Sequence, residues 1–181
     1  MKKYLIIGGT GSLGKALTER LKEDNIVGIF SRDEAKQWTL KNEEKNHKNI
    51  KFFVGDIRDY SRVENVITSF NPDVVIIAAA LKQVDTCELS PAESIKTNVQ
   101  GPINVVNAIE RNMNTIKCST VVMVSTDKAC EPVNVYGMCK SIAERIVTSK
   151  AQFYDGSKIK FVATRYGNVL DSRGLSLIHI S

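Results

Sequence analysis

The sequence predicts an α/β fold in which helices cover both faces of a parallel sheet, a doubly wound arrangement. Short apolar runs rich in β-branched residues alternate along the chain with segments of helical periodicity. The runs are apolar through most of their length, as expected for strands that are covered on both faces. The resulting β-α-β-α order favours parallel strands that are joined by right-handed crossovers.

The elements can be assigned in chain order from these patterns. The expected strands are the short apolar runs, namely Tyr4–Gly8, Ile26–Phe30, Ile50–Val54, Val74–Ala78, Thr120–Ser125 and Ile159–Thr164. The expected helices are the periodic segments between them, namely Leu13–Lys22, Glu34–Leu40, Ser61–Phe70, Ala92–Asn112 and Val135–Phe153. Pro102 should kink or split the fourth helix after Gly101, because a proline ring clashes with the preceding helical turn.

Composition narrows the class of protein. The 181 residues are 43% hydrophobic and 25% charged, which suits one globular domain with a single core. The net charge of +5 would suit an anionic ligand, but the basic residues are scattered, so no nucleic-acid surface is expected. The start of the chain runs directly into a short apolar strand, which predicts neither a signal peptide nor a membrane segment.

The cysteines and histidines predict no metal site. The four cysteines form no Cys-x-x-Cys pair, and both histidines lie far from them in the sequence. Unpaired cysteines without a signal peptide fit a reducing cytoplasm, where thiols usually behave as small buried apolar groups. The expected location is therefore the cytoplasm.

A glycine-rich turn follows the first strand and opens the first helix. It runs Gly8-Gly-Thr10-Gly11-Ser12-Leu13-Gly14. Bare backbone N–H groups at a helix N-terminus bind a pyrophosphate, and glycine allows the anion to approach the backbone. Three spaced glycines would also suit a structural turn, but their place between a strand and a helix favours dinucleotide binding. The predicted fold is therefore an NAD(P)-binding Rossmann fold.

The end of the second strand bears on the choice of cofactor. An acidic residue there holds the ribose of NAD, whereas an arginine holds the 2′-phosphate of NADP. Here Ser31 and Arg32 end the strand, which favours NADP, and Asp33 keeps NAD as the alternative. Asp56, after the third strand, could meet the adenine amino group, although it suits a helix or turn cap nearly as well.

Residues with catalytic chemistry follow the fifth strand. Ser125-Thr126-Asp127-Lys128 lies at its carboxyl end, the edge where open α/β sheets bind ligands. Tyr136 and Lys140 then share one face of a helix. A lysine one turn away supplies the positive charge that favours a tyrosine phenolate. Such a pair is usually an ordinary helix surface, but with the upstream glycine turn it indicates hydride chemistry at an alcohol carbon.

Several motifs together resemble one family. They are GGTGSLG, IFSRDEAKQ, GDIRD, AAALKQV, KTNVQG, STDKAC, VNVYGMCK and TRYGNVLDSRG, which run from the first strand to Gly174. This set resembles the extended short-chain dehydrogenases and, within them, the UDP-N-acetylglucosamine 4,6-dehydratases of polysaccharide and flagellar-sugar biosynthesis. The resemblance implies a UDP-sugar substrate and a homo-oligomer at full length.

The resemblance also implies a role for each matching residue. The pyrophosphate would lie on Thr10, Gly11, Ser12 and Leu13, and the adenosine phosphate on Ser31, Arg32, Asp33, Glu34, Ala35 and Lys36. Asp56 and Ile57 would contact adenine, and Ala78 with Lys82 would lie on the nicotinamide side, with Lys82 also near the substrate. Near the sugar nucleotide or the nicotinamide would lie Asn168, Val169 and Arg173.

The implied reaction is an elimination of water that begins and ends with hydride transfer. Tyr136 and Lys140, aided by Thr126, would take the proton of the sugar 4-hydroxyl as hydride leaves C4 for NADP⁺. Lys128 would then remove the acidified C5 proton while Asp127 assists loss of the C6 hydroxyl as water. Hydride return to C6 regenerates the cofactor, with inversion at C5 as one stereochemical outcome.

Two alternatives stay open. A UDP-sugar 4-epimerase would share the fold and the Tyr136–Lys140 pair but would need no base for C5. A truncated, inactive nucleotide-binding fragment is the second alternative, because residues 1–174 would form a cofactor domain that is incomplete without a substrate lobe. Residues 175–181 are expected to be a non-native tail, since this heptapeptide is what a common transposon adapter encodes, although a natural apolar end would look similar.

Overall fold

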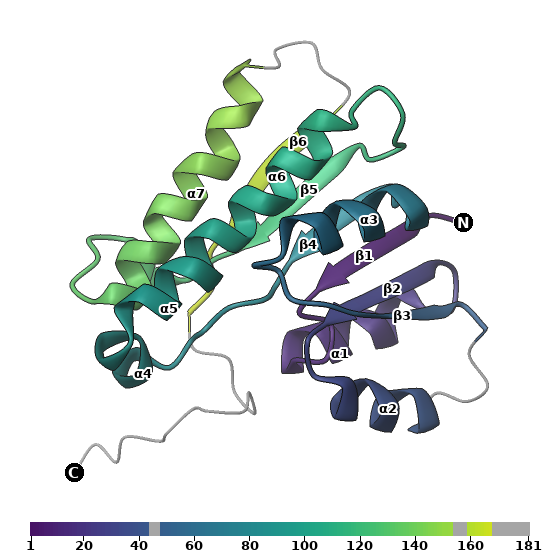
Figure 1. Cartoon of the computed structure of the whole chain (residues 1–181), viewed down its shortest axis with the longest axis horizontal. Helices are drawn as coiled ribbons and strands as arrows, with labels where there is room; N and C mark the ends of the chain where they lie inside the picture. The colour runs from purple at the N-terminus through teal and green to yellow at the C-terminus, as the bar shows by residue number, and fades with distance from the viewer. Residues whose placement is uncertain (44–47, 154–158, 168–181) are drawn as a thin grey trace.

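In the computed structural model, one six-stranded sheet organises the chain (Figure 1). The structure describes residues 1–43, 48–153 and 159–167. All strand pairs are parallel, and the order across the sheet is β3-β2-β1-β4-β5-β6. The strands are β1 (Lys3–Ile7), β2 (Ile26–Ser31), β3 (Ile50–Val54), β4 (Val74–Ile77), β5 (Thr120–Val124) and β6 (Lys160–Thr164). The predicted parallel sheet is confirmed, with each strand within one residue of its expected bounds.

The strand order reverses at β1. From β1 the chain continues outward through β2 and β3, and then returns to place β4 on the other side of β1. Two main-chain hydrogen bonds bridge the strand ends there, from Gly8 N–H to the Phe30 carbonyl (2.8 Å) and from Ala78 N–H to the Ile7 carbonyl (2.8 Å). The carboxyl ends of the strands beside such a reversal are where open α/β folds bind their ligands.

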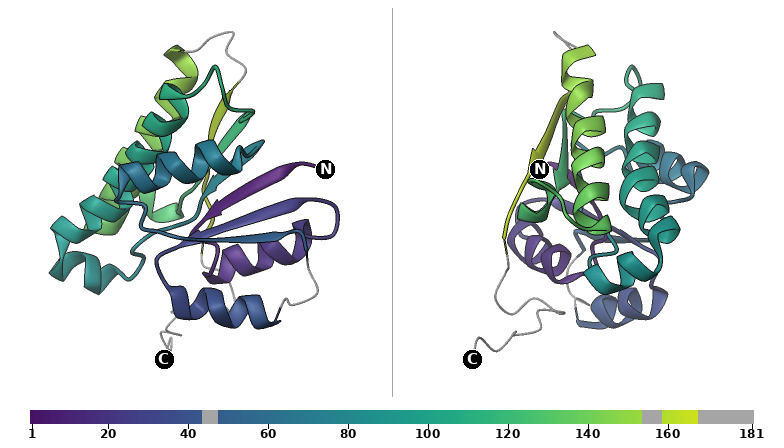
Figure 2. Two further views of the ribbon diagram at one scale, coloured as in Figure 1. Left: turned by 45° about the vertical axis from the view of Figure 1, so that its right-hand side comes forward. Right: turned by 90° about the vertical axis from the view of Figure 1, so that its left-hand side faces the viewer.

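Helices lie on both faces of the sheet (Figure 2). One face is covered by α1 (Ser12–Leu21) and α2 (Glu34–Glu43). The other face is covered by α3 (Tyr60–Phe70), α6 (Gly101–Arg111) and α7 (Val135–Phe153). The predicted doubly wound arrangement is therefore confirmed.

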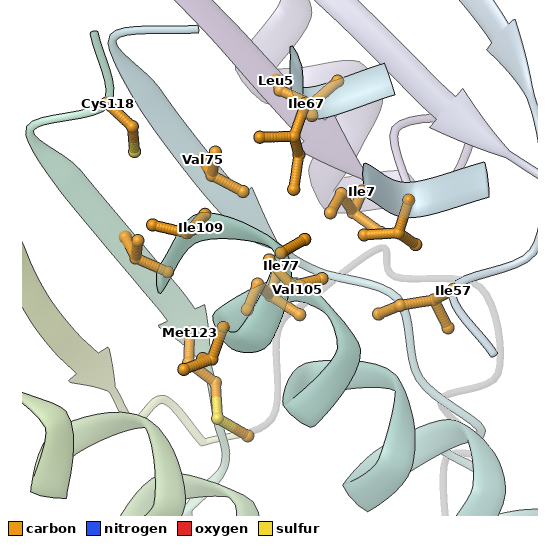
Figure 3. Close-up of a cluster of buried hydrophobic side chains, with 14 of the residues drawn as sticks. Leu5, Ile7, Ile57, Ile67, Val75, Ile77, Val105, Ile109, Cys118 and Met123 are labelled. Atoms are coloured by element: carbon orange, nitrogen blue, oxygen red, sulfur yellow. The ribbon is translucent and has the colours of Figure 1, made fainter. Parts of the chain in front are cut away.

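The apolar core is divided by the sheet into two clusters. Leu5 and Ile7 of β1 point into the cluster beneath α3 and α6, whereas Ile6 points into the cluster beneath α1 and α2. Figure 3 shows part of the larger cluster, in which Val105 and Ile109 of α6 pack over the strands. Because both faces of the central strands are buried, their sequences are continuously apolar.

Three of the four cysteines fit the prediction that they are small buried groups. Cys87, Cys118 and Cys139 are buried, whereas Cys130 is exposed, and all four are free thiols. Burial raises the pKa of Cys118 to about 11, which keeps it as a neutral thiol at physiological pH.

The segment between β4 and α6 differs from the prediction. A short helix that was not predicted, α4 (Val84–Leu89), precedes α5 (Pro91–Ile95), and a π-helical turn (Lys96–Gln100) connects α5 to α6. The helical backbone therefore continues up to Gly101, whose N–H bonds to the Lys96 carbonyl five residues earlier. The irregularity precedes Gly101 instead of following it, because a widened turn provides the room that the Pro102 ring needs.

The start of α1 packs directly on the turn that follows β1. A Cβ atom added to Gly14 would lie 2.5 Å from the backbone of Gly9, closer than real Cβ contacts. At Gly11 the nearest atom to an added Cβ would be the Gly8 carbonyl oxygen at 3.3 Å. Gly14 therefore sets how closely the helix approaches the strand, whereas Gly11 does not.

We expect Gly14→Ala to lower the free energy of unfolding by about 1 to 3 kcal/mol, the usual cost of overpacking, although alanine is the better helix former. The matched control, Gly11→Ala, should lower it by less than about 1 kcal/mol. Urea unfolding of both variants measures this as a change in midpoint at constant slope. Equal midpoints for the two variants would contradict the close packing at Gly14.

Candidate active site

The turn between β1 and α1 is shaped to receive an anion. Gly8 has a φ of 92°, a left-handed conformation that residues with a side chain rarely adopt. Gly11 is the N-cap of α1 and makes no side-chain hydrogen bond to the first helical N–H groups. The N-cap residue therefore places no side chain over the positive end of the helix dipole. This cradle fits the pyrophosphate of a dinucleotide, as the sequence predicts for Thr10, Ser12, Leu13 and Gly14 nearby.

Charged side chains surround the end of β2. The Arg32 side chain is 57% exposed, and its Nη1 lies 3.9 Å from Asp56 Oδ2. Asp33 instead accepts a hydrogen bond from the Lys36 N–H (3.0 Å) and forms an ion pair with the Lys36 ammonium. The hydrogen bonds from Lys36 lower the pKa of the Asp33 carboxyl. Asp33 therefore acts as a cap at the start of α2, while the guanidinium of Arg32 faces solvent.

The other predicted residues of this region differ in how accessible they are. Ser31 is buried, and its hydroxyl accepts a hydrogen bond from Gln37 Nε2 (3.0 Å). Glu34, Ala35 and Lys36 lie in the exposed first turn of α2. The site at the end of β2 is therefore formed by exposed charged groups around a buried serine.

Asp56 and Ile57 follow β3 and are held by contacts that the sequence did not predict. Arg58 donates hydrogen bonds to the Asp56 carboxylate from Nη2 (2.7 Å) and Nε (3.0 Å). Burial opposes ionisation, but these hydrogen bonds outweigh it and lower the pKa of Asp56. The Ile57 side chain is buried in the core, and its carbonyl accepts from Asn104 Nδ2 (3.0 Å). Any contact of Ile57 with adenine therefore falls to its main chain.

Ala78 and Lys82 follow β4 at the middle of the same edge. Lys82 is exposed, and Ala78 lies beside the end of β1 through its N–H bond to Ile7. Leu81 lies between them in the sequence. The buried side chain of Asn98 accepts a hydrogen bond from the Leu81 N–H (2.9 Å) and donates one to the Leu81 carbonyl (2.8 Å). Asn98 was not predicted to have this role, because nothing in the motif around it indicates a partner 17 residues away. Asn98 holds the loop that carries Lys82.

A 3₁₀ turn at Asp127–Ala129 follows β5 and carries the predicted acid and base. The Thr126 hydroxyl donates to Asp127 Oδ1 (2.9 Å), and the Lys128 ammonium lies 3.4 Å from the same oxygen. The hydrogen bond from Thr126 and the nearby Lys128 charge lower the pKa of Asp127. Both side chains remain open to solvent, at 56% for Asp127 and 37% for Lys128.

The first turn of α7 packs against this 3₁₀ turn. A Cβ atom on Gly137 would lie 2.2 Å from the Lys128 carbonyl oxygen, so only glycine permits the contact. Tyr136, beside it, is 9% exposed. Burial raises the pKa of Tyr136 to about 12, whereas its hydrogen-bond interaction with Thr126 opposes the rise. The structure thus brings Thr126, Asp127, Lys128 and Tyr136 together at one strand end.

Lys140 lies one turn further along α7 and is 4% exposed. Its ammonium donates to the Val124 carbonyl at the end of β5 (2.8 Å). Burial lowers the pKa of Lys140 to about 8, and the charge of Glu144 opposes this shift. The buried ammonium of Lys140 thus lies one helical turn along α7 from Tyr136 and is held at the end of β5.

Glu144 and Arg165 are functional candidates that the sequence patterns did not predict. Glu144 is 7% exposed, and Arg165 reaches it from the end of β6 through Nη2 (2.7 Å) and Nε (2.9 Å). The spacing of Lys140 and Glu144 on one helix face is the signal that could have found the acid. The remaining predicted residues, Asn168, Val169 and Arg173, lie outside the described residues, as do residues 175–181.

Within residues 1–43, 48–153 and 159–167, no helix is long and apolar enough to cross a lipid bilayer. Within the same ranges, no three His, Cys, Asp or Glu side chains gather in a way that could hold a metal ion.

A parallel sheet of this order, with an open glycine turn after β1 and a tyrosine–lysine helix beside β5, defines the Rossmann-type fold of the NAD(P)-binding short-chain dehydrogenases. A family model described as polysaccharide biosynthesis protein matches residues 4–180. The chain belongs to this polysaccharide biosynthesis protein family.

Comparison with individual proteins agrees with this assignment. The chain is 44% identical to a UDP-glucose 4-epimerase of Rickettsia canadensis (strain McKiel), over 96% of this chain and 50% of the relative. It resembles the X-ray structure of Pen from Bacillus thuringiensis with a TM-score of 0.88 and 39% identity, over 96% of this chain and 54% of the other.

The fold is also similar to UDP-glucose 4-epimerase from Brucella ovis in complex with NAD. The TM-score is 0.75 at 21% identity, over 93% of this chain and 52% of the other. At this identity the likeness concerns the fold alone. The chain spans about half the length of the curated relatives it matches.

The buried charge of Lys140 should affect stability in a pH-dependent way. A fall in pKa from its ordinary 10.5 to about 8 corresponds to a cost of about 3 kcal/mol when both the folded and unfolded chains are protonated. We therefore expect Lys140→Met to raise the free energy of unfolding by about 1 to 3 kcal/mol at pH 7, since loss of the bond to Val124 offsets part of the gain.

The sign follows from the lowered pKa. Between pH 8 and 10.5 the unfolded chain keeps a proton that the folded chain has lost, so the unmutated chain gains stability with rising pH. The advantage of Lys140→Met should be complete below pH 8 and absent above about pH 10.5. Urea unfolding at several pH values measures it, and an advantage that does not change with pH would contradict the buried ammonium.

Proposed function

We propose that this chain is the cofactor-binding part of an NADP-dependent 4,6-dehydratase of a UDP-N-acetylhexosamine, with UDP-N-acetylglucosamine as the substrate. The observation that carries the proposal is the Asp127–Lys128 pair on one 3₁₀ turn, 3.4 Å apart and beside buried Tyr136. Elimination of water needs an acid and a base in addition to the group that deprotonates the 4-hydroxyl. A simple alcohol oxidation would use Tyr136 and Lys140 alone.

Each residue has a stated task in this proposal. The chemistry supplied by bound nicotinamide is reversible hydride transfer. Tyr136 takes the proton of the sugar 4-hydroxyl, and the ammonium of Lys140 favours its phenolate. The 4-keto group acidifies C5, whose proton passes to Lys128 in its neutral form, while Asp127 in its acid form protonates the departing C6 hydroxyl.

The protonation states of Asp127 and Lys128 in the free chain differ from those that the reaction needs. The lowered pKa of Asp127 favours its carboxylate, so the acid form must be produced in the closed complex, where water is excluded and the acid is desolvated. A proton exchanged between Lys128 and Asp127 over their 3.4 Å contact would create the neutral base and the acid together. The overall balance is the loss of one water molecule from the sugar.

The preference for NADP rests on the end of β2. The Arg32 guanidinium is 57% exposed, whereas the Asp33 carboxylate is already engaged by Lys36. A guanidinium in this position suits a 2′-phosphate, and an occupied carboxylate is a poor partner for a free ribose hydroxyl. NAD remains the alternative cofactor.

Arg32→Ala should weaken NADP binding by roughly tenfold to a hundredfold, because a charge-assisted hydrogen bond is lost, and should leave NAD binding unchanged. Isothermal titration of both nucleotides against the chain itself measures this. Arg20→Ala removes an exposed arginine from the far end of α1 and should change neither affinity. An equal loss of affinity for NADP and NAD would show that Arg32 does not distinguish between the two cofactors.

A second candidate function is UDP-sugar 4-epimerisation. It is favoured by the name UDP-glucose 4-epimerase that the relatives at 41–44% identity carry. An epimerase would use the same Tyr136 and Lys140 but would have no task for Lys128. The products distinguish them, since a dehydratase yields a 4-keto-6-deoxy sugar and an epimerase yields a C4 epimer with an intact 6-hydroxyl.

The assay compares a protein of the relatives' length that contains this sequence with the chain alone. UDP-N-acetylglucosamine, UDP-glucose and NADP⁺ are supplied, and the products are identified by NMR. Nucleotide binding by the chain without turnover would identify it as a binding unit only. For the longer protein we further propose a homo-oligomer, which the exposed apolar side chains of Met138 and Ile142 on α7 support.

In the longer protein, Lys128→Ala should slow dehydration by roughly 10²- to 10⁴-fold, as expected for loss of a general base, without weakening NADP binding. Lys117→Ala is the matched control, because Lys117 is exposed and precedes β5, at the opposite end of that strand. An unchanged rate of dehydration in Lys128→Ala would exclude Lys128 as the base. If the unmutated protein yields only a C4 epimer, the proposed dehydratase activity is wrong and the epimerase activity takes its place.

A further inference from the structure

Helix α7 buries two opposite charges on successive turns. Lys140 is 4% exposed and Glu144 is 7% exposed, and both face the carboxyl ends of β5 and β6. A buried charge is costly unless it is paired and hydrogen-bonded. An apolar pair at these positions would pack as well without that cost, so the two charges need an explanation beyond stability.

The two charges have separate partners. The Lys140 ammonium donates to the Val124 carbonyl (2.8 Å). Glu144 is held in a bidentate clamp by Arg165, whose Nη2 lies 2.7 Å from Oε2 and whose Nε lies 2.9 Å from Oε1. The clamp fixes the carboxylate in place and in its ionised form, because a guanidinium matches a carboxylate in geometry as well as charge.

The clamp is anchored at three points of the site. Arg165 directly follows β6, and its Nη1 also contacts the Cys130 sulfur (2.8 Å) just after the 3₁₀ turn that carries Lys128. Arg165 therefore joins the end of β6 to α7 and to the loop after Lys128. This fixed frame keeps the Glu144 carboxylate at a constant position relative to Lys140.

We propose that Glu144, held by Arg165, is a positioning residue that keeps the Lys140 side chain in its ammonium form at the carboxyl end of β5. The inference deepens the proposed function and rests on it in one respect, since the ammonium of Lys140 is the charge that favours the Tyr136 phenolate. Without the carboxylate, burial alone would act on Lys140 and release its proton near neutral pH.

Other ionisable groups surround this part of α7. Tyr136 and Cys139 lie on the same helix, and Cys87 of α4 faces them. Asp127 and Lys128 lie on the neighbouring 3₁₀ turn, and Arg165 and Tyr166 lie at the end of β6. Further along α7, Lys150 pairs with Glu110 of α6. Within the described part of the chain, Glu144 is the group whose charge raises the pKa of Lys140 against the effect of burial.

The test is a direct titration of Lys140 in the chain itself. The lysine side chains are labelled with ¹³C at Cε, the Lys140 signal is assigned by its loss in Lys140→Met, and its shift is followed from pH 5 to pH 11. The readout requires neither cofactor nor turnover. It therefore distinguishes failure of this proposal from failure of the proposed reaction.

Two variants should move the Lys140 pKa in opposite directions. Glu144→Gln removes the carboxylate and should lower the pKa by about 1 to 3 units from its value of about 8. Arg165→Met removes a nearby cation and leaves the carboxylate to Lys140, so it should raise the pKa by about 1 unit or more. A change in packing common to both variants would shift the pKa in one direction, so shifts of opposite sign would show that the charges of Glu144 and Arg165 act on Lys140.

Two controls complete the test. Glu110→Gln removes a partly buried acid that also pairs with a lysine of α7, and it should leave the Lys140 pKa unchanged. Arg165→Lys keeps the positive charge and should return the pKa towards that of the unmutated chain. If Glu144→Gln does not fold, the double variant Glu144→Gln/Arg165→Met, which leaves neither charge unpaired, replaces it, and its Lys140 pKa should lie below that of Arg165→Met.

A Lys140 pKa that stays the same in both folded variants would overturn the proposal. The same would follow from shifts of the same sign. In the longer protein, the turnover pH profile of Glu144→Gln should lose its activity near neutrality and shift together with the pKa of Lys140. A profile that does not move while the pKa does would show that the clamp does not serve the reaction.

Discussion

The central constraint of this structure is that β1 pairs in parallel with both β2 and β4. This pairing brings the Gly8 N–H to the Phe30 carbonyl and the Ala78 N–H to the Ile7 carbonyl, so that three strand ends meet in one row. The glycine turn, Arg32 and the loop before Lys82 take their positions from that row. The register of β4 with β5 then extends the edge to Thr126, and β6 extends it to Arg165.

The buried groups at this edge reflect a conflict between stability and chemistry. Tyr136 and Lys140 are both desolvated, which raises the pKa of the phenol to about 12 and lowers that of the ammonium to about 8. Each shift alone moves the pair away from a phenolate beside an ammonium. The hydrogen bond with Thr126 opposes the shift of Tyr136 and the charge of Glu144 opposes that of Lys140, and a positive charge bound beside them would favour the phenolate further.

Local sequence patterns predict the strands and the long helices, because continuous apolar runs and helical periodicity are properties of neighbouring residues. They also predict that Thr126, Asp127, Lys128 and Tyr136 meet, since parallel strands share one carboxyl edge. They do not predict α4, which has only six residues and no clear apolar face. Long-range side-chain contacts were missed for a different reason: Asn98 to Leu81 and Arg165 to Glu144 depend on the packed fold, which short windows of sequence do not contain.

The two asparagines on either side of Pro102 have a mechanical consequence. Asn98, on the widened π-helical turn, bonds both main-chain groups of Leu81, and Asn104, on α6, bonds the carbonyls of Ile57 and Arg58. These hydrogen bonds fix the loops after β3 and β4 to one continuous helical segment. A nucleotide that displaced either loop would have to bend that segment or break the bonds, so the two loops should move together.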